Sequence, residues 1–568
     1  MSNVLALKPY IELIRTHCSN LSQSEVINLL CGIAQEVPAK ERQSFLEKLE
    51  ITSSTPSTLS DRVEKVDEIL SGIEGIIEDI LERQESIEDG SYYEDYDNYD
   101  NYYDDEPDII STEQREELKE AFADADQLFL AGELDSARKV YQKLISIFLH
   151  NSELDLYYSI DRQDIRINWR ETLSRYCRCV YETVSAADRT RQVLDAMEAD
   201  YPLADQYYGS SEEWLPSLQD IYNARPEEII DWDDFLQGIQ IVLQRNTGNR
   251  AVLLCLEAVH CTDGLQGLAA AVREKKSPLG YLYWLNQLEA DALWEEAAQA
   301  ALEALDNMPS DRLRAAAADA LVRAGEQIEK KSLVLHGKQE QFFSEPTGQY
   351  LACWLEEAKK QEAKAEMLDK ALAFLKNRLG GSQKEMSWEK NRFFLLKIKV
   401  LLLSGQLKDA YAEIDKEAVV GWSNTKQTTA VVYTCILLAL VRCSAETRTI
   451  HGLSSSYLAL SGEDAITEEI LQHLAKLTPA AQEEWFQFAE RMTQARIDHI
   501  VSNKYRKAYG RAAEVLGGYM EALILNDRKD QAVEFLHLNR NQKYSRFSAF
   551  RAEIQRVTGG SPLLARLK

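Results

Sequence analysis

The chain has 568 residues, 45% of them apolar, so most of it can fold, and its length predicts two to four folded units. Its 93 acidic and 64 basic side chains give a formal charge of −29, which disfavours nonspecific binding to nucleic acid or anionic membranes and favours basic partners. The nine scattered cysteines are typical of free thiols in a reducing cytosol. Because Met1–Tyr10 lacks an export signal and the longest apolar run, Val431–Val441, is too short to span a membrane, we expect a cytoplasmic protein.

The first 88 residues are expected to form an N-terminal helical unit at 1–50, a linker at Ser53–Ser60 and a long helix at 60–88. In this helix apolar residues recur from Val63 to Ile87 with alternating steps of three and four, the rhythm of a coiled coil. The same spacing also suits an amphipathic helix that packs on its own chain. The sequence leaves both alternatives open, and the first predicts a homo-oligomer formed through residues 60–88.

Residues 89–111 form an acidic linker rich in tyrosine. No basic residue lies between Arg83 and Arg115, whereas 12 acidic residues do. Repulsion between like charges and the lack of aliphatic side chains predict a flexible tether, with a specific protein-binding role as the alternative. The spacing of Asp95, Asp97 and Asp100 invites a calcium interpretation, but the glycine turn of an EF-hand loop is missing, so we expect no calcium site.

The rest of the chain is predicted to be helical, with repeat arrays at 112–378 and 388–568 and a linker at 379–387. A signature returns four times: an apolar helix, a short turn, and an alanine five residues after the turn residue. The four copies pair Gly132 with Ala137, Ala292 with Ala297, Gly405 with Ala410, and Asp527 with Ala532. This pattern predicts an all-α fold, a TPR-like α-solenoid of stacked helix pairs, whose product is a concave binding surface.

Motifs of catalysis are missing from the sequence. It contains no P-loop, no dinucleotide-binding glycine fingerprint, no GxSxG elbow and no HExxH. Cys177-Arg178-Cys179 offers two thiolates to zinc, but no CxxC or CxH follows nearby to complete a site. We therefore assign no catalytic, cofactor-binding or metal-binding residues and expect a non-catalytic protein; a site assembled from distant residues is the alternative that sequence leaves open.

The C-terminal segment is basic. From Arg496 to Lys568 there are 14 Lys and Arg against 7 Asp and Glu. Basic and aromatic residues interleave in Lys504–Arg511 and Lys543–Arg551, a pattern that can bind phosphates and stack on bases. Alternatively, Tyr544 and Phe547 belong to a helical core. Binding to nucleic acid is expected through this segment only.

From Trp294 onward the order of motifs resembles the large bacterial TPR-like helical-repeat proteins associated with SWIM zinc fingers. The matching pieces are Trp294–Ala297, Pro309–Ala315, Phe342–Leu355, Gly405–Ala410, Gly421–Ser423 and Tyr505–Leu516. The resemblance covers about half of the chain and implies the repeat scaffold alone. The SWIM pattern needs CxC followed by CxH, and this chain has only the first half, so no metal is implied.

In size and helical layout the chain is also similar to accessory proteins of type III-E CRISPR loci. That likeness implies cleavage by a guide-RNA-activated caspase-like protease and restraint of a sigma factor in bacterial antiviral defence.

The repeat pattern and the acidic charge predict a protein–protein interaction scaffold that binds a basic partner in its groove. The alternative is an acidic regulatory inhibitor that sequesters a basic nucleic-acid-binding protein, such as a sigma factor, and is released by proteolysis at Leu379–Glu385.

Overall fold

The computed structural model shows helices joined by turns and short connections, and no strand in the residues it describes. Those residues are 7–23, 26–27, 29–30, 33, 45, 59–89, 91, 108–148, 156–201, 214–380, 387–416, 427–442, 444–457, 464–476 and 483–567. The predicted all-α class is confirmed. Contacts divide the chain into two units, Met1–Gln287 and Leu288–Lys568, and each is described by itself.

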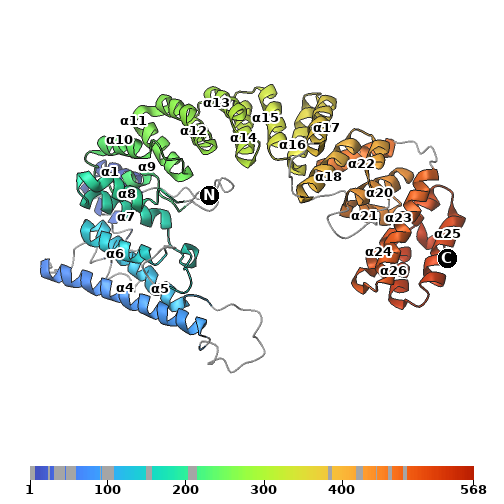
Figure 1. Ribbon diagram of the computed structural model, residues 1–568, viewed down its shortest axis with the longest axis horizontal. Helices are drawn as coiled ribbons and strands as arrows, with labels where there is room; N and C mark the ends of the chain where they lie inside the picture. Colours follow the sequence, from blue (N-terminus) through green and yellow to red (C-terminus); the bar gives the residue numbers. More distant parts are fainter. Residues whose placement is uncertain are drawn as a thin grey trace. The chain divides into compact units, whose positions relative to one another are not determined.

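The first unit is a succession of helices in which chain neighbours pack together: α5 on α6, α6 on α7, α7 on α8, and α10 on α11 (Figure 1). In chain order its helices are α1 (Leu7–Ser19), α4 (Leu59–Glu88), α5 (Thr112–Leu130), α6 (Leu134–Ser146), the short 3₁₀ helix η4 (Arg162–Asp164), α7 (Trp169–Thr183), α8 (Ala186–Ala196), α9 (Leu218–Asn223), α10 (Trp232–Leu243) and α11 (Asn249–Lys275). Helix α12 (Pro278–Ala290) spans the boundary between the units.

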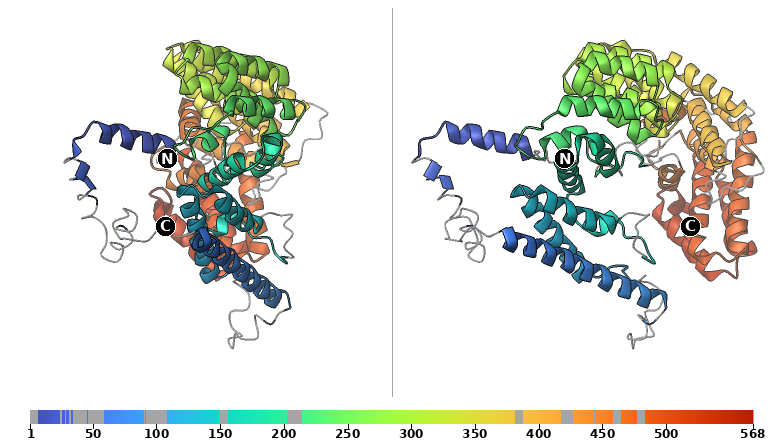
Figure 2. Two further views of the ribbon diagram at one scale, coloured as in Figure 1. Left: turned by 90° about the vertical axis from the view of Figure 1, so that its left-hand side faces the viewer. Right: turned by 60° about the vertical axis from the view of Figure 1, so that its left-hand side comes forward.

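Helix α4 packs on its own chain. Its residues Val66, Ile73, Ile77 and Ile80 are buried in one core with α5 and α6, and Figure 2 shows the helix lying along this part of the unit. Gln84, at the next position of the heptad pattern, is fully buried and exchanges two hydrogen bonds of 3.0 Å with the backbone of Tyr158. The side of α4 that a coiled coil requires is therefore already occupied, and pairing through residues 60–88 is not proposed.

The second unit is built in the same way, and its buried residues from Phe342 to Leu564 share one continuous core. Its helices are α13 (Trp294–Asn307), α14 (Arg312–Gln327), α15 (Lys331–Ser344), α16 (Gly348–Lys360), α17 (Lys364–Gly380), α18 (Ser387–Leu403), α19 (Leu407–Glu413), α20 (Gln427–Leu440), α21 (Arg448–Tyr457), α22 (Asp464–Lys476), α23 (Glu483–Ser502), η6 (Arg506–Ala508), α24 (Tyr509–Leu525), α25 (Lys529–His537), η7 (Leu538–Lys543), α26 (Ser548–Gly560) and η8 (Leu564–Leu567). Helix α22 packs against α16, α18 and α20, none of which adjoins it in the chain.

The predicted linker at 379–387 lies within this second unit. Helix α17 continues to Gly380 and α18 begins at Ser387, while residues 381–386 lie outside the described residues. The boundaries predicted for the two arrays and for the 1–50 unit, most of which is also outside the description, stay predictions.

The four predicted turns share one backbone geometry. Gly132, Ala292, Gly405 and Asp527 all have positive φ, between 55° and 82°. In each turn the next residue donates its N–H to the carbonyl five residues back, which is the Schellman bond that ends a helix. The bonds run from Glu133 to Leu128, Leu293 to Leu288, Gln406 to Leu401, and Arg528 to Leu523, with N···O distances of 2.9–3.0 Å. Ala137, Ala297, Ala410 and Ala532 are all fully buried, as close helix crossing requires.

Turns of this kind also occur where the sequence pattern did not reveal them, at Glu198, Glu329, Glu362 and Lys504 among the residues described. Glu329 and Glu362 have φ of 54° and 58°, and Lys330 and Ala363 donate the corresponding bonds to Gly325 and Ala358, each 2.8 Å long. Five residues after the turns at Glu329 and Glu362 stand buried Val334 and Met367 in place of alanine. Since neither turn uses glycine and neither crossing uses alanine, both copies are invisible to a search for the signature.

Candidate protein-interaction surface

The formal charge is divided unequally between the two units. Residues 1–287 contain 55 acidic and 26 basic side chains, whereas residues 288–568 contain 38 of each. The net charge of −29 therefore belongs entirely to the first unit. A partner that recognises charge would meet a very different field on each unit.

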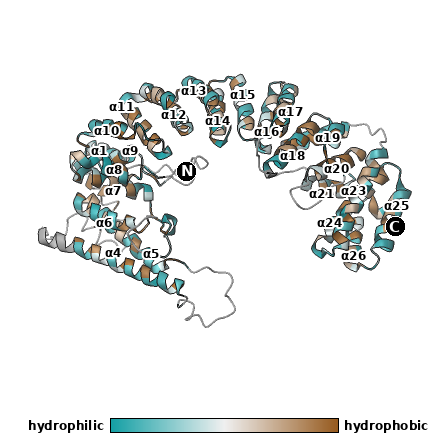
Figure 3. Cartoon of the chain, viewed as in Figure 1, coloured by the Kyte–Doolittle hydropathy of each residue, from teal (hydrophilic) through white to brown (hydrophobic). Residues whose placement is uncertain are grey.

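Most of this charge lies on α4, on α5 and in the segment between them. Residues 66–120 contain 21 acidic side chains and only 3 basic ones. The exposed carboxylates of the two helices define what we call the acidic α4–α5 surface: Asp67, Glu68, Glu74, Glu78, Asp79, Glu82, Glu85, Glu88, Glu113, Glu116, Glu117 and Glu120. Figure 3 shows α4 with hydrophilic residues alternating with the hydrophobic residues of its packed side.

The three basic residues of this region are all engaged in local contacts. The Arg83 guanidinium donates twice to the carbonyl oxygen of Asp108 at 3.0 Å, and Arg115 binds the Asp108 carboxylate at 3.2 Å. Lys119 pairs with Glu116 one helical turn away. The carboxylates of the α4–α5 surface are therefore offset by few bases, and most of their charge faces solvent.

Asp108 also attaches the far end of the acidic linker to α4. Its contact with Arg83, near the end of α4, brings the far flank of the linker back to the helix from which the linker starts. Ile110, two residues later, is fully buried in the core that α4 shares with α5. Both flanks of the linker thus contact the same folded unit, and its roles as a flexible tether or a protein-binding segment stay predictions. Tyr92–Pro107, with Asp95, Asp97 and Asp100, lie outside the described residues.

The CxC pair lies in the middle of α7. Cys177 and Cys179 are both fully buried, and they contribute to two different hydrophobic cores of the first unit. Burial raises the pKa of both thiols, that of Cys179 to about 12. Protonated thiols packed on apolar neighbours are poor metal ligands. In the described part of the chain no three His, Cys, Asp or Glu side chains are grouped as a metal site would need.

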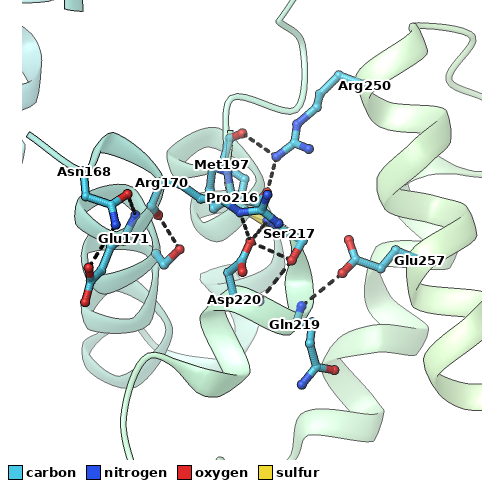
Figure 4. A network of polar contacts seen from close by, with 11 residues as sticks. Asn168, Arg170, Glu171, Met197, Pro216, Ser217, Gln219, Asp220, Arg250 and Glu257 are labelled. Carbon is cyan, nitrogen blue, oxygen red and sulfur yellow. Dashed lines mark hydrogen bonds and ion pairs between the residues drawn. The ribbon is translucent and has the colours of Figure 1, made fainter. Parts of the chain in front are cut away.

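Sequence reasoning missed a network of buried charges in the same unit. Figure 4 shows Arg250 and Glu257 reaching from α11 toward the segment that precedes α9. Arg250 donates to the carbonyl oxygens of Met197, at 3.4 Å, and of Pro216. Glu257 accepts the N–H of Gln219 at 3.0 Å and that of Leu218, the first residues of α9. A charged residue within the apolar run Leu253–Ala258 was the one available signal.

The other end of α9 is held by Arg178, the residue between the two cysteines. This fully buried guanidinium donates to the carbonyl oxygens of Tyr222, at 3.3 Å, and of Glu227, at 2.7 Å. Burial raises the pKa of Glu257, and the N–H donors of α9 oppose that shift by stabilising the carboxylate. These charges fix a six-residue helix in place, and we assign them a structural role.

Most aromatic residues of the basic C-terminal segment belong to the core, and Tyr505 is the exposed exception. Tyr544 is 3% exposed and Phe550 is fully buried, and their rings meet at 5.8 Å. Tyr509 approaches Phe550 from α24 at 5.8 Å, and Phe547 lies 5.7 Å from Tyr544. The core interpretation of these aromatics is therefore correct, and they do not offer faces on which bases could stack.

No protein-family model matches the sequence, and no curated protein matches it. Among the described helices, none combines the length and the unbroken apolar character needed to cross a lipid bilayer. The fold and the surface together define the class: an all-α protein of stacked helix pairs whose first unit displays a concentrated acidic surface. The resemblances to SWIM-associated and CRISPR-associated proteins, and the concave groove, stay predictions.

Proposed function

We propose that this chain is a non-catalytic adaptor that binds a basic protein partner through the acidic α4–α5 surface. Two observations carry the proposal: residues 66–120 contain 21 acidic and 3 basic side chains, and 12 of these carboxylates are exposed on α4 and α5, two helices that pack in one core. A field of one sign steers an oppositely charged partner and disfavours others.

The arrangement of the carboxylates indicates what kind of partner fits. Glu74, Glu78, Glu82 and Glu85 are exposed and follow one another at steps of four, four and three, so they line one side of α4. Gln84 and the buried isoleucines hold the opposite side of the helix, so this row of charges has a fixed orientation. A helix or extended tail with Lys or Arg at similar intervals matches this row.

The test is a pull-down from the native host at low and high salt, with mass spectrometry of the retained proteins. Charge attraction between exposed groups weakens as the Debye length shortens, so a partner bound here is lost at high salt. The decisive variant is Glu78→Lys, Glu82→Lys and Glu85→Lys. Its matched control is Glu326→Lys, Glu356→Lys and Glu534→Lys, three exposed carboxylates of the second unit.

The proposal requires that the α4 variant loses the partner while the control variant retains it. Retention by both variants, with α4 still folded by circular dichroism, would show that the partner binds elsewhere.

A second candidate function is an inhibitor that sequesters a basic nucleic-acid-binding protein, such as a sigma factor, with the acidic surface in place of phosphates. The same density of charge favours it, because carboxylates at this spacing resemble a polyanion. Here the chain must displace labelled DNA from the captured partner in a fluorescence anisotropy titration. Formation of a ternary complex with DNA would instead support a simple adaptor.

Release by proteolysis at Leu379–Glu385 extends this second candidate. Leu379 and Gly380 still belong to α17, and helical backbone resists proteases, which bind extended chains. We therefore expect any cut in this segment to fall after Gly380. Limited proteolysis followed by mass spectrometry of the fragments locates the cut.

A further inference from the structure

Two segments of the second unit contain basic residues and no acidic ones. Residues 499–513 include four bases and residues 536–552 include four more, with no Asp or Glu in either segment. They are separated by more than twenty residues in sequence, so their shared composition has meaning for a surface only if the fold brings them together.

The fold does bring them together, through aromatic packing. The ring of Tyr509 lies 5.8 Å from that of Phe550, and the hydroxyls of Ser502 and Tyr544 are 3.4 Å apart. Tyr509, Tyr544 and Phe550 are buried in the core, whereas basic side chains of both segments are exposed to solvent. The exposed bases around this cluster define what we call the basic surface: Lys504, Arg506, Lys507, Arg511, Arg546 and Arg551.

The neighbouring carboxylates are engaged elsewhere. Asp498 accepts hydrogen bonds from Lys543 at 2.7 Å and from Tyr544 at 2.5 Å. Glu514 and Glu553 both pair with Arg556, at 3.6 Å and 2.7 Å. Their charges are thus largely offset by Lys543 and Arg556, and the basic surface keeps its positive field although the unit as a whole is neutral.

We propose that the basic surface binds an acidic polypeptide segment, as a second interaction site separate from the acidic α4–α5 surface. Four of its six bases are arginines, whose planar guanidinium groups match carboxylates in two parallel hydrogen bonds. Single-stranded nucleic acids need exposed aromatic faces for stacking, and here Tyr509, Tyr544 and Phe550 are buried. Tyr505, half exposed beside the exposed His499, is the most accessible tyrosine of this region among the residues described, and Phe547 is partly buried.

The binding test uses the full chain and two labelled probes in fluorescence anisotropy. The first is a peptide with the sequence of residues 89–111, which contains nine acidic residues and no basic one. The second is a single-stranded oligonucleotide with the same number of negative charges. We expect tighter binding of the peptide, weakening as salt rises. Tighter binding of the oligonucleotide would show that the surface binds nucleic acid instead. If neither probe binds, the proposed site does not exist.

Charge-reversal variants locate the peptide on the structure. The test variant combines Lys504→Glu, Arg506→Glu and Lys507→Glu. The backbone conformation is expected to stay the same, since Lys504 has a φ of 57° and glutamates adopt this conformation at Glu329 and Glu362. The control reverses three exposed lysines of the same unit: Lys330→Glu, Lys331→Glu and Lys376→Glu. We expect the first variant to lose affinity about ten-fold or more and the control about two-fold or less. Equal losses in both variants would show nonspecific attraction to the whole unit and overturn the proposal.

Discussion

Glu257 and Arg178 bind opposite ends of α9, a helix of six residues. The Glu257 carboxylate accepts the first N–H groups of the helix, and the Arg178 guanidinium donates to its last carbonyl oxygens. Each charge has the sign that complements the helix dipole at its end. So short a helix is not stable alone, and these two buried side chains supply the hydrogen bonds that it lacks.

Replacement of Arg178 by methionine is therefore expected to lower the free energy of unfolding by about 3 kcal/mol, because it leaves buried carbonyl oxygens without donors. Chemical denaturation followed by circular dichroism measures this loss. The matched control is Arg191→Met on α8, where the side chain is exposed. A loss no larger than that of the control would show that Arg178 does not stabilise α9.

The turn geometry predicts opposite effects of glycine at two alanines five residues apart. Ala292 has a φ of 55°, so Ala292→Gly should stabilise the protein by about 0.5–1 kcal/mol by relieving strain. Ala297 is buried in the following helix, so Ala297→Gly should destabilise it by about 1 kcal/mol. Thermal unfolding of the two variants gives both values. Effects of the same sign would contradict the assigned turn.

Gln84 is expected to be the residue that fixes the position of α4 along its unit. Gln84→Met keeps the volume but removes both hydrogen bonds to the Tyr158 backbone, at a cost of about 2 kcal/mol. Hydrogen exchange should then show faster opening of α4 than in the control Glu85→Met, whose side chain is exposed. Unchanged protection of α4 would assign its anchoring to the apolar residues alone.

A cluster of charges around α22 predicts how stability depends on pH. Glu469 binds Lys359 at 2.8 Å and also Lys364, so it links α22 to the turn between α16 and α17. Hydrogen bonds from these lysines lower the pKa of Glu469 from 4.5 to about 2. The lowered pKa means that this contribution is complete above about pH 4.5 and is lost as the pH falls toward 2.

The shift corresponds to at most about 3 kcal/mol at neutral pH, and because Lys359 is half exposed, solvent screening reduces the contribution to about 1–2 kcal/mol. Glu469→Gln should therefore reduce stability at pH 7 and flatten its decline between pH 5 and pH 2, as followed by denaturation at several pH values. Glu366→Gln is the control, since Glu366 pairs with Lys370 on an exposed side of α17. A decline as steep as that of the unchanged protein would place the acid-sensitive group elsewhere.

His473 adds to this dependence in the same direction. Burial and the nearby Lys364 lower its pKa below the ordinary value of 6.5. The unfolded chain therefore takes up this proton before the folded one, and stability decreases as the pH falls below about 6.5. His473→Asn should remove the part of the decline that begins as the pH falls below 6.5.

Local signals in the sequence were sufficient for the helical class and for four of the repeat turns. Gly132 and Gly405 mark helix ends because glycine adopts positive φ without strain, and the alanine that follows each turn marks a close crossing. Glu329 and Glu362 adopt the same conformation without any such marker. There the helices packed on both sides hold the turn, and a preference of the residue itself plays no part.

The two candidate surfaces also combine features that the sequence shows with features that only the tertiary structure shows. The sequence by itself determined the acidic charge, the heptad rhythm of α4 and the basic composition of the C-terminal segment, because these are properties of residues close together in the chain. Only the tertiary structure decided that α4 packs on its own unit and that Tyr544 and Phe550 are core residues. It also showed that residues 499–513 and 536–552 share one surface. Each of these depends on contacts between distant residues, such as Gln84 with Tyr158, whose geometry no local pattern records.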